Sequence, residues 1–343
     1  MRTAELYALR SLRLVDAPVP APGPGQVLVR MKAVGICGSD LHDFSEGRIG
    51  DQECKYPMVL GHEPAGEVVQ TGPGVSGWAP GDRVAVEPAL YCYHCEFCLT
   101  GRHNICANIR FMSSPEDPGF FREFVSVPAG NLLPLPEGLG FREGTLFEPL
   151  AVVLHSMKFA ALRPRETVAV FGAGPIGLLT ILTVKMSGAG RVWAVEPVAE
   201  RRQMARAAGA DAVIDPHAVE AWQEILRDTG RRGVDVAIDC AAREDSTNQC
   251  IRAARNGGRV VITGIPVEIQ LPLEFHVARR KELVLYNVRR SCHDSETALK
   301  VLAEAPARFG ALVTHALPLE RAQAAFEMLE HYSDGAGKVV LEP

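Results

Sequence analysis

The strongest constraint on the fold is an alternation of short apolar runs with helix-length stretches, which starts at about Val168. Six runs have the length and apolar character of buried strands, and most are separated by stretches long enough for a helix. They read TVAVF, RVWAVE, DAVI, VDVAID, GRVVITG and LVLYNV. Strict alternation of strand and helix is typical of an α/β fold with a doubly wound parallel sheet. We therefore predict such a domain in this half of the chain.

The first 150 residues have a different pattern. Short runs such as QVLVRMKAVGI, EPAGEVVQTG and DRVAVEP are rich in β-branched residues and are bounded by Gly and Pro, which predicts a β-rich region. After about Val288 the alternation stops. LERAQAAFEMLEH predicts an amphipathic helix there, and GKVVLEP predicts a final strand.

Length and charge exclude several classes of function. The chain has 343 residues, a formal net charge of -5 and no long run of Lys or Arg, so we expect no nucleic-acid partner. The N-terminus lacks the apolar core of a signal peptide, which predicts a cytoplasmic protein. The longest uncharged run, residues 167–184, is interrupted by Gly and Pro, so we expect a strand, a turn and a helix there and no membrane span.

A glycine-rich segment, VAVFGAGPIGLL, follows the first strand of the predicted parallel sheet. Gly172 would allow the tight turn, Gly174 would let the backbone approach a pyrophosphate, and Gly177 would let helix and strand pack closely. Pro175 and Ile176 lie at the start of the helix, whose N-terminus would receive the pyrophosphate. We interpret these five residues as part of a dinucleotide site.

An acidic residue stands at the expected distance from the glycines. Glu196 closes the next strand, about 20 residues further on, where it would accept hydrogen bonds from the ribose hydroxyls of adenosine. Its charge would repel a 2'-phosphate, which favours NAD over NADP. Arg201 could flank the ribose, although Arg201 and Arg202 could also serve a phosphate, so NADP remains the second choice.

Four cysteines occur at the spacing C-x2-C-x2-C-x7-C. Cys92, Cys95, Cys98 and Cys106 can converge on one point, and four thiolates around Zn2+ form a closed site of the structural kind. Without an export signal, disulfides are the less favoured interpretation. A redox C-x-x-C would need a thioredoxin-like context, and an iron–sulfur cluster has no other support in the sequence.

We predict no functional role for the remaining cysteines or for two histidines near the cluster. We interpret His94 and His103 as surface residues. Cys54, Cys240, Cys250 and Cys292 have no partner spacing and are treated as ordinary thiols.

A second group of residues carries reactive chemistry. VGICGSDLHDF predicts a tight turn that holds Cys37, Ser39, Asp40 and His42, and the adjacent pair His62–Glu63 follows in VLGHEPAGEVV. A catalytic zinc needs about three protein ligands and an open position. Cys37, His62 and a carboxylate supply them, and Glu148 in LFEPLAVVLHS is a further carboxylate at the entry to the nucleotide-binding half.

These residues also carry a resemblance to a known family. ICGSDLH, GRIGDQECKYPMVLGHEPAGEVV, FEPL and GAGPIG are similar to motifs of the zinc-dependent medium-chain alcohol dehydrogenases, in particular the sorbitol (polyol) dehydrogenase branch. The resemblance implies a GroES-like β-rich catalytic domain over residues 1–152 and 288–343. It also implies a Rossmann NAD-binding domain over residues 153–287.

The resemblance assigns the two zinc sites. It implies a catalytic zinc held by Cys37, His62 and Glu63, with Glu148 approaching the metal directly or through water. The four-cysteine lobe, about residues 90–108, matches the structural zinc site of the family.

Further roles follow from the same resemblance. Ser39 would take the proton of the substrate hydroxyl and pass it through the nicotinamide ribose towards His42, and Asp40 would orient a zinc ligand. Phe111 and Arg290 match positions near the substrate. Asp43 departs from the branch, which usually has an aromatic residue there, so sorbitol itself is in doubt.

The sequence therefore predicts a zinc-dependent oxidoreductase that moves hydride from a polyol or another secondary alcohol to NAD. Two alternatives stay open: a threonine-dehydrogenase-like oxidation of an amino alcohol, and a cofactor-binding sensor without turnover. The expected partners are a small-molecule alcohol and further copies of the chain, as a homotetramer or dimer.

Overall fold

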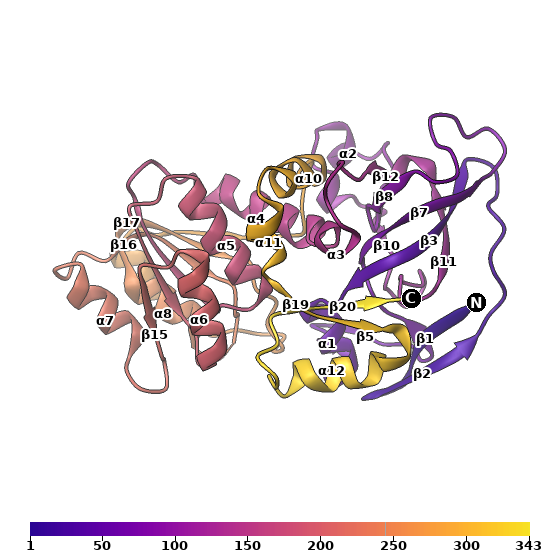
Figure 1. Ribbon diagram of the computed structural model, residues 1–343. Helices are drawn as coiled ribbons and strands as arrows, with labels where there is room; N and C mark the ends of the chain where they lie inside the picture. Colours follow the sequence, from indigo (N-terminus) through magenta and orange to yellow (C-terminus); the bar gives the residue numbers. More distant parts are fainter. Residues whose placement is uncertain (244) are drawn as a thin grey trace. The chain divides into compact units, whose positions relative to one another are not determined.

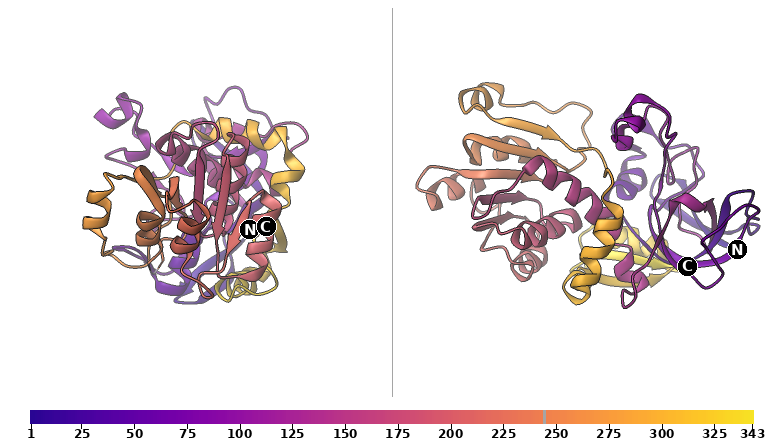
Figure 2. Two further views of the ribbon diagram at one scale, coloured as in Figure 1. Left: turned by 90° about the vertical axis from the view of Figure 1, so that its left-hand side faces the viewer. Right: turned by 90° about the horizontal axis from the view of Figure 1, so that it is seen from above.

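The chain folds into two units in this computed structural model, which describes residues 1–243 and 245–343. Unit 1 comprises Met1–Glu148 and Cys292–Pro343, and unit 2 comprises Pro149–Ser291. Both chain termini therefore belong to unit 1 (Figures 1 and 2). Among the described residues, no helix combines the length and apolar character that a bilayer span requires.

Unit 1 is β-rich, as predicted. Its largest sheet has the order β12-β8-β7-β3-β20-β19, and β11 also pairs with β3. Its strands are β1 (Arg2–Ala8), β2 (Ser11–Asp16), β3 (Gln26–Gly35), β4 (Arg48–Ile49), β5 (Gln52–Glu53), β6 (Met58–Val59), β7 (Glu63–Thr71), β8 (Arg83–Val86), β9 (Ala89–Leu90), β10 (Arg110–Phe111), β11 (Phe124–Pro128), β12 (Leu132–Pro134), β19 (Val313–Pro318) and β20 (Lys338–Glu342).

The helices of unit 1 are short. They are α1 (Gly38–Glu46), α2 (Glu96–Leu99), η1 (His103–Ile105), η2 (Ala129–Asn131), α3 (Phe141–Gly144), α10 (Ser295–Glu304), α11 (Pro306–Gly310), η3 (Leu319–Arg321) and α12 (Ala322–Glu330). The amphipathic helix predicted near the C-terminus is η3 continued by α12, and its buried residues include Phe326 and Leu329.

The segment after β3 corrects one prediction. The tight turn expected around Cys37 and His42 is the first part of α1, a helix that extends to Glu46. Asp40 lies in the first turn, where its Oδ2 accepts a hydrogen bond of 2.9 Å from the N–H of Cys37. An acidic side chain at this place satisfies a backbone donor and suits the helix dipole, so the chain continues as a helix.

Strand register brings the ends of two strands together in unit 1. The antiparallel pair β3 and β7 aligns Gly35 with Glu63. The end of β3 is therefore beside the start of β7, close to where Cys37 follows one strand and His62 precedes the other. On the other side of β3, β20 aligns Val340 with Gly35. Residues distant in sequence thus meet near one end of the neighbouring strands β7, β3 and β20.

Unit 2 contains the predicted parallel sheet, with the strand order β15-β14-β13-β16-β17-β18 among the described residues. All five pairings are parallel, as expected for a doubly wound α/β sheet. The strands are β13 (Thr167–Phe171), β14 (Arg191–Val195), β15 (Ala212–Ile214), β16 (Val234–Asp239), β17 (Ala254–Ile262) and β18 (Val284–Asn287).

The helices of unit 2 connect these strands. They are α4 (Phe147–Ala160), which starts in unit 1, α5 (Pro175–Met186), α6 (Ala199–Ala208), α7 (Ala221–Asp228), α8 (Ser246–Ala253) and α9 (Phe275–Arg280). Residues of β13, β14 and β16 are buried almost throughout, because helices on both faces exclude water from a parallel sheet.

One buried carboxylate, that of Asp235 in β16, bonds to residues near the N-terminal ends of β13 and β17. Asp235 Oδ2 accepts hydrogen bonds from the N–H and the hydroxyl of Thr167, each of 2.9 Å. Its Oδ1 accepts bonds from Arg232 at 2.6 Å and Arg255 at 2.7 Å. Burial opposes ionisation of Asp235, but Arg232 and the other donors outweigh burial and hold the pKa of this carboxyl well below its usual value.

Replacing Asp235 with Asn is expected to lower the free energy of unfolding by about 2–3 kcal/mol at pH 7, because two arginines lose a buried partner. The folded pKa is depressed, so this stabilisation is present above the unfolded pKa of about 3.9 and disappears as pH falls through the folded value. Urea denaturation of both proteins should therefore show curves that converge at low pH. Glu224→Gln, which removes an exposed ion pair with Arg227, is the control and should change stability by less than about 0.5 kcal/mol. A difference at pH 7 that persists unchanged at pH 3 would contradict the assignment.

Candidate metal centres and nucleotide site

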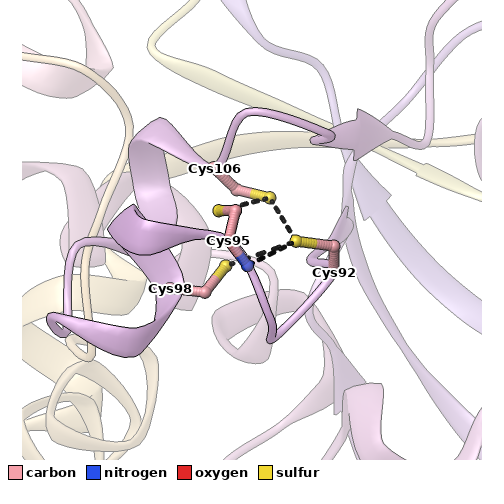
Figure 3. Close-up of side chains that lie close together, drawn as sticks. All are labelled: Cys92, Cys95, Cys98 and Cys106. Atoms are coloured by element: carbon pink, nitrogen blue, oxygen red, sulfur yellow. Dashed lines mark hydrogen bonds between the residues drawn. The ribbon is translucent and has the colours of Figure 1, made fainter.

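Four thiols converge in the lobe of unit 1 that carries α2 and η1. The Sγ atoms of Cys92, Cys95, Cys98 and Cys106 all lie within 4.8 Å of one another, and Figure 3 shows the side chains around one point. The Cys92–Cys98 and Cys95–Cys106 sulfur distances are 3.9 Å, and the Cys92–Cys106 distance is 3.4 Å. A tetrahedron with Zn–S bonds of about 2.3 Å requires sulfurs roughly 3.8 Å apart. The four thiols fit a zinc ion, and they are too far apart for disulfides, whose S–S length is about 2.05 Å.

Backbone amides around the lobe favour thiolates. The N–H of Cys95 donates to Cys92 Sγ, and the N–H of Asn108 donates to Cys106 Sγ, each over 3.4 Å. The backbone N–H of His94 contributes most to lowering the pKa of the Cys92 thiol, which falls to about 5. Because zinc binds the deprotonated form of cysteine, these amides prepare the lobe for a metal.

A second donor set lies where β3 ends and β7 begins. Ligand atoms of Cys37, His62 and Glu63 lie within 4.8 Å of one another. A thiolate, an imidazole and a carboxylate form a three-ligand set that leaves one coordination position open, as in catalytic zinc sites. The carboxylate of Glu63 is buried and forms an ion pair with the buried ammonium group of Lys338. A buried carboxylate is stable only beside positive charge, which a metal ion would also supply.

Asp40 connects this donor set to the rest of unit 1. Only 1% exposed, it accepts hydrogen bonds from the N–H of Cys37, from the N–H of Gly61 at 3.1 Å and from Ser113 Oγ at 3.2 Å. Its Oδ1 also lies 3.3 Å from His62 Nδ1. This contact leaves Nε2 of His62 for a metal, in the arrangement by which a carboxylate orients a ligating histidine.

Charge in the cluster favours a cation. Burial opposes protonation of His62, but Asp40 and Cys37 outweigh it and raise the pKa of His62 well above its usual value. The same negative groups that attract a proton to this imidazole would attract a metal ion, with which the proton must compete.

Lys338, at the start of β20, is a member of the site that sequence reasoning missed. It is 1% exposed, its Nζ forms an ion pair with Glu63, and it donates a hydrogen bond of 2.9 Å to the carbonyl of Ile36. The sequence pattern of GKVVLEP predicts only a strand. A lysine at the head of an apolar strand was the available signal, because a buried Lys requires a partner.

Glu148, at the start of α4, lies near the cluster but outside the 4.8 Å group. Burial raises the pKa of the Glu148 carboxyl to about 7, and the negative charges of Glu63 and Glu87 add to the rise, while His62 and Lys338 oppose it. A carboxyl group that titrates near neutrality beside a donor set can accept or release a proton at working pH.

Two further predicted residues lie beside His62. Ser39 Oγ is 3.4 Å from His62 Nε2, and the ring centroid of Phe111 is 5.3 Å from that of His62. His42 is in the same helix as Ser39 and is 9% exposed. The predicted catalytic serine and the predicted aromatic wall are therefore both close to the donor set.

The other two predicted substrate residues are placed differently. Asp43 is 5% exposed and accepts a hydrogen bond of 3.2 Å from the Cys54 thiol, and burial raises the pKa of its carboxyl to about 7. Arg290 belongs to unit 2, where it has a left-handed φ of 52°. Their contact with substrate stays a prediction.

The glycine-rich segment forms the turn between β13 and α5. Gly172 has a φ of 90°, which favours glycine, and a Cβ on Gly177 would lie 1.9 Å from the carbonyl oxygen of Gly172. Gly174 is the N-cap of α5, and Pro175 and Ile176 form its first turn. The N–H groups at this helix start are available for a phosphate group.

The side chain of Glu196 is hydrogen-bonded to a backbone N–H group of this turn. It is 4% exposed, and its carboxylate accepts hydrogen bonds from the N–H of Ala173 at 2.7 Å and from the N–H of Val198 at 2.9 Å. Arg201 lies near the turn, with one guanidinium nitrogen 3.8 Å from a Cβ built on Gly174. Arg202 forms a 3.0 Å ion pair with Asp215 and also donates hydrogen bonds to the carbonyls of Glu196 at 2.8 Å and Pro197 at 2.6 Å.

A β-rich unit with a three-donor cluster and a four-thiol lobe, and a unit with a parallel sheet and a glycine-rich turn, together define a class. Such a chain is built as a zinc- and dinucleotide-dependent dehydrogenase.

Comparison with known proteins supports this class of dehydrogenase. Residues 23–137 match the family model for the alcohol dehydrogenase GroES-like domain, and residues 175–304 match that for zinc-binding dehydrogenases. Sorbitol dehydrogenase of Bacillus subtilis (strain 168) is 33% identical over 343 residues, which cover 100% of this chain and 97% of the relative. Sorbitol dehydrogenase of Homo sapiens is 41% identical over 319 residues, 92% of this chain and 89% of the relative. This chain belongs to the zinc-dependent medium-chain alcohol dehydrogenase family and is sorbitol dehydrogenase-like, as predicted.

A solved structure shows the same fold over the whole length. The crystal structure of 2R,3R-butanediol dehydrogenase from Bacillus subtilis has a TM-score of 0.89 and 31% sequence identity, and the match covers 100% of this chain and 99% of that one.

Proposed function

We propose that this chain oxidises a secondary hydroxyl group of a polyol or a related alcohol to a ketone, with NAD as the hydride acceptor. The observation that carries the proposal is the set of Cys37, His62 and Glu63 donors within 4.8 Å, with Glu148 nearby. The names of the relatives supply the substrate class, because sorbitol and butanediol both carry secondary hydroxyl groups. The catalytic domain in this proposal spans residues 1–152 and 288–343, and the NAD-binding domain spans residues 153–287.

Cys37, His62 and Glu63 would hold the catalytic zinc, and Cys92, Cys95, Cys98 and Cys106 would hold the structural zinc. A zinc ion with an open position supplies Lewis acidity, which lowers the pKa of a hydroxyl group beside it. Asp40, whose Oδ1 is 3.3 Å from His62 Nδ1, would orient the imidazole of His62.

The proton would leave through side chains of α1. Ser39, whose Oγ is 3.4 Å from His62 Nε2, would accept the hydroxyl proton, and His42 on the same helix would be the further acceptor. Glu148 provides a second carboxyl group near the donor set. Phe111 would form an apolar wall beside the reacting carbon, and Asp43 and Arg290 would contact other substrate hydroxyls.

Unit 2 would bind the cofactor through the turn at Gly172, Gly174 and Gly177 and through the start of α5 at Pro175 and Ile176. Glu196 places a negative charge at the end of β14, which disfavours a 2'-phosphate, and Arg202 is engaged with Asp215. Both features support NAD, with Arg201 as a flanking contact. We further propose a cytoplasmic homo-oligomer, a tetramer or dimer.

The proposal is tested by a screen of polyols, sugars and amino alcohols with NAD and with NADP, following absorbance of the reduced cofactor. We expect the highest kcat/KM for a polyol or diol with NAD. Glu196→Gln should shift the NAD to NADP ratio of kcat/KM by about tenfold towards NADP, because the repelling charge is removed. Glu200→Gln, an exposed carboxylate in the first turn of α6, is the control. A preference for amino alcohols or for NADP in the unmodified chain would contradict the proposal.

Lys338→Met should lower kcat/KM about tenfold or more, because Glu63 loses its buried cationic partner. Removing a positive charge also raises the pKa of nearby acids, so the acidic limb of the pH–rate profile should move to higher pH. Lys338→Arg keeps the positive charge, so it should retain part of the activity and show a smaller shift of the pH–rate profile. A fall in activity without a shifted pH profile would assign Lys338 a purely structural role.

A further inference from the structure

A third group of metal-binding side chains lies in unit 1, apart from both donor sets described above. Donor atoms of His103, Cys292 and His293 all lie within 4.8 Å of one another. His103 belongs to η1 in the four-cysteine lobe, between Cys98 and Cys106. Cys292 and His293 begin the segment with which the chain returns to unit 1. The fold therefore joins two segments that are far apart in sequence.

The two imidazole rings are in direct contact. Their centroids are 4.0 Å apart, and the planes meet at 89°. Tyr91 also packs on His103, with a centroid distance of 4.4 Å. The interpretation of His103 as a surface residue is therefore incomplete, because its ring contacts the rings of Tyr91 and His293.

The backbone at residues 292 and 293 brings the side chains of Cys292 and His293 close to His103. Cys292 is 7% exposed, and its thiol donates a hydrogen bond of 3.1 Å to the carbonyl of Gly101. Its N–H is held by Asp294 Oδ2 at 3.1 Å. His293 is exposed and has a φ of 59°, a left-handed conformation that is uncommon for a residue with a side chain. Such conformations concentrate at functional positions.

The donor set selects the kind of metal. Two imidazoles and one thiolate suit borderline-soft ions such as Zn2+, whereas Mg2+ and Ca2+ require oxygen ligands. Three protein donors leave a fourth position for water or an external ligand. Binding would remove the thiol proton of Cys292, which would pass to solvent, and would replace its hydrogen bond to Gly101 with a bond to the metal.

We propose that His103, Cys292 and His293 form a third zinc site, which ties the four-cysteine lobe to the segment that follows Cys292. The site has one ligand fewer than the lobe and one exposed ligand, so it binds zinc more weakly and fills only at higher free zinc. It is independent of the proposed reaction, since its donors are separate from those of Cys37, His62 and Glu63.

The first test is the zinc content of the full-length chain, equilibrated with increasing buffered free zinc and measured by elemental analysis. Unmodified protein should rise from about two to about three ions per chain, and His293→Ala should stop at about two. His293 is exposed, so this variant should keep its fold. His217→Ala, an exposed histidine of unit 2, is the control and should also reach three. Saturation of the unmodified chain at two ions, or a third ion retained in His293→Ala, would overturn the proposal.

The second test identifies the ligands by their spectrum. Chain that already holds its two tighter zinc ions is titrated with Co2+, and a thiolate-to-cobalt charge-transfer band should appear in the near ultraviolet. Cys292→Ser should lose this band while circular dichroism confirms the fold, and His217→Ala should keep it. Cobalt bound without the band, or an equal band in Cys292→Ser, would show that Cys292 is not a ligand.

Discussion

Replacing Cys37 with Ser is expected to lower kcat/KM for alcohol oxidation by about a thousandfold and to remove one zinc ion per chain. A serine hydroxyl is a poor zinc ligand, and the remaining pair of His62 and Glu63 is too small a set to retain the metal. The backbone should be unaffected, because the hydrogen bond from residue 37 to Asp40 uses the main-chain N–H. Activity and zinc content of purified variant and parent provide the measurement.

Cys54→Ser is the matched control for this prediction. Cys54 is a partly buried thiol of the same unit that donates to Asp43, and a serine hydroxyl can donate in its place. This variant should keep its zinc and most of its activity. Full activity in Cys37→Ser, or an equal loss in Cys54→Ser, would contradict the assignment of Cys37 as a ligand.

Replacing Cys98 with Ser should affect stability where Cys37→Ser affects activity. We expect a large loss of stability in Cys98→Ser, with the catalytic zinc retained. The lobe around residues 90–108 has few buried apolar side chains, so its folding depends on the metal. We expect the loss of one zinc ion and a fall in Tm of roughly 10 °C. Limited proteolysis should cut the variant within the lobe, where the parent is resistant.

Leu99→Ser is the control for the lobe. Leu99 is the next residue in α2 and is 73% exposed, so the substitution should change stability by less than about 0.5 kcal/mol. If Cys98→Ser kept both its zinc content and its Tm, the four thiols would not form a metal site. Together, Cys37→Ser and Cys98→Ser separate an ion that supports the reaction from an ion that supports the fold.

Local patterns were sufficient to predict the architecture. The runs TVAVF and VDVAID are apolar throughout because both faces of a parallel strand are covered, so they identify the sheet of unit 2 without any knowledge of contacts. The four-cysteine lobe was equally accessible, because its ligands lie within 15 consecutive residues and their spacing alone brings them together. The glycine-rich turn was also predictable, because its glycines lie within a few consecutive residues.

Other features depend on contacts that no local pattern contains. Lys338 meets Glu63 because β20 pairs with β3 and β3 pairs with β7, and that pairing is a property of strand register. The helix that replaces the expected turn at Cys37 depends on Asp40, whose carboxylate also reaches Gly61 and Ser113.

The sequence by itself thus determined the α/β class and the grouping of the four thiols in the lobe, since hydrophobic periodicity and short-range spacing are local properties. Only the tertiary structure decided that Lys338 compensates Glu63, or that His103 meets Cys292 and His293. The physical reason is that these groups are joined through sheet pairing and chain return, whose geometry depends on the whole core.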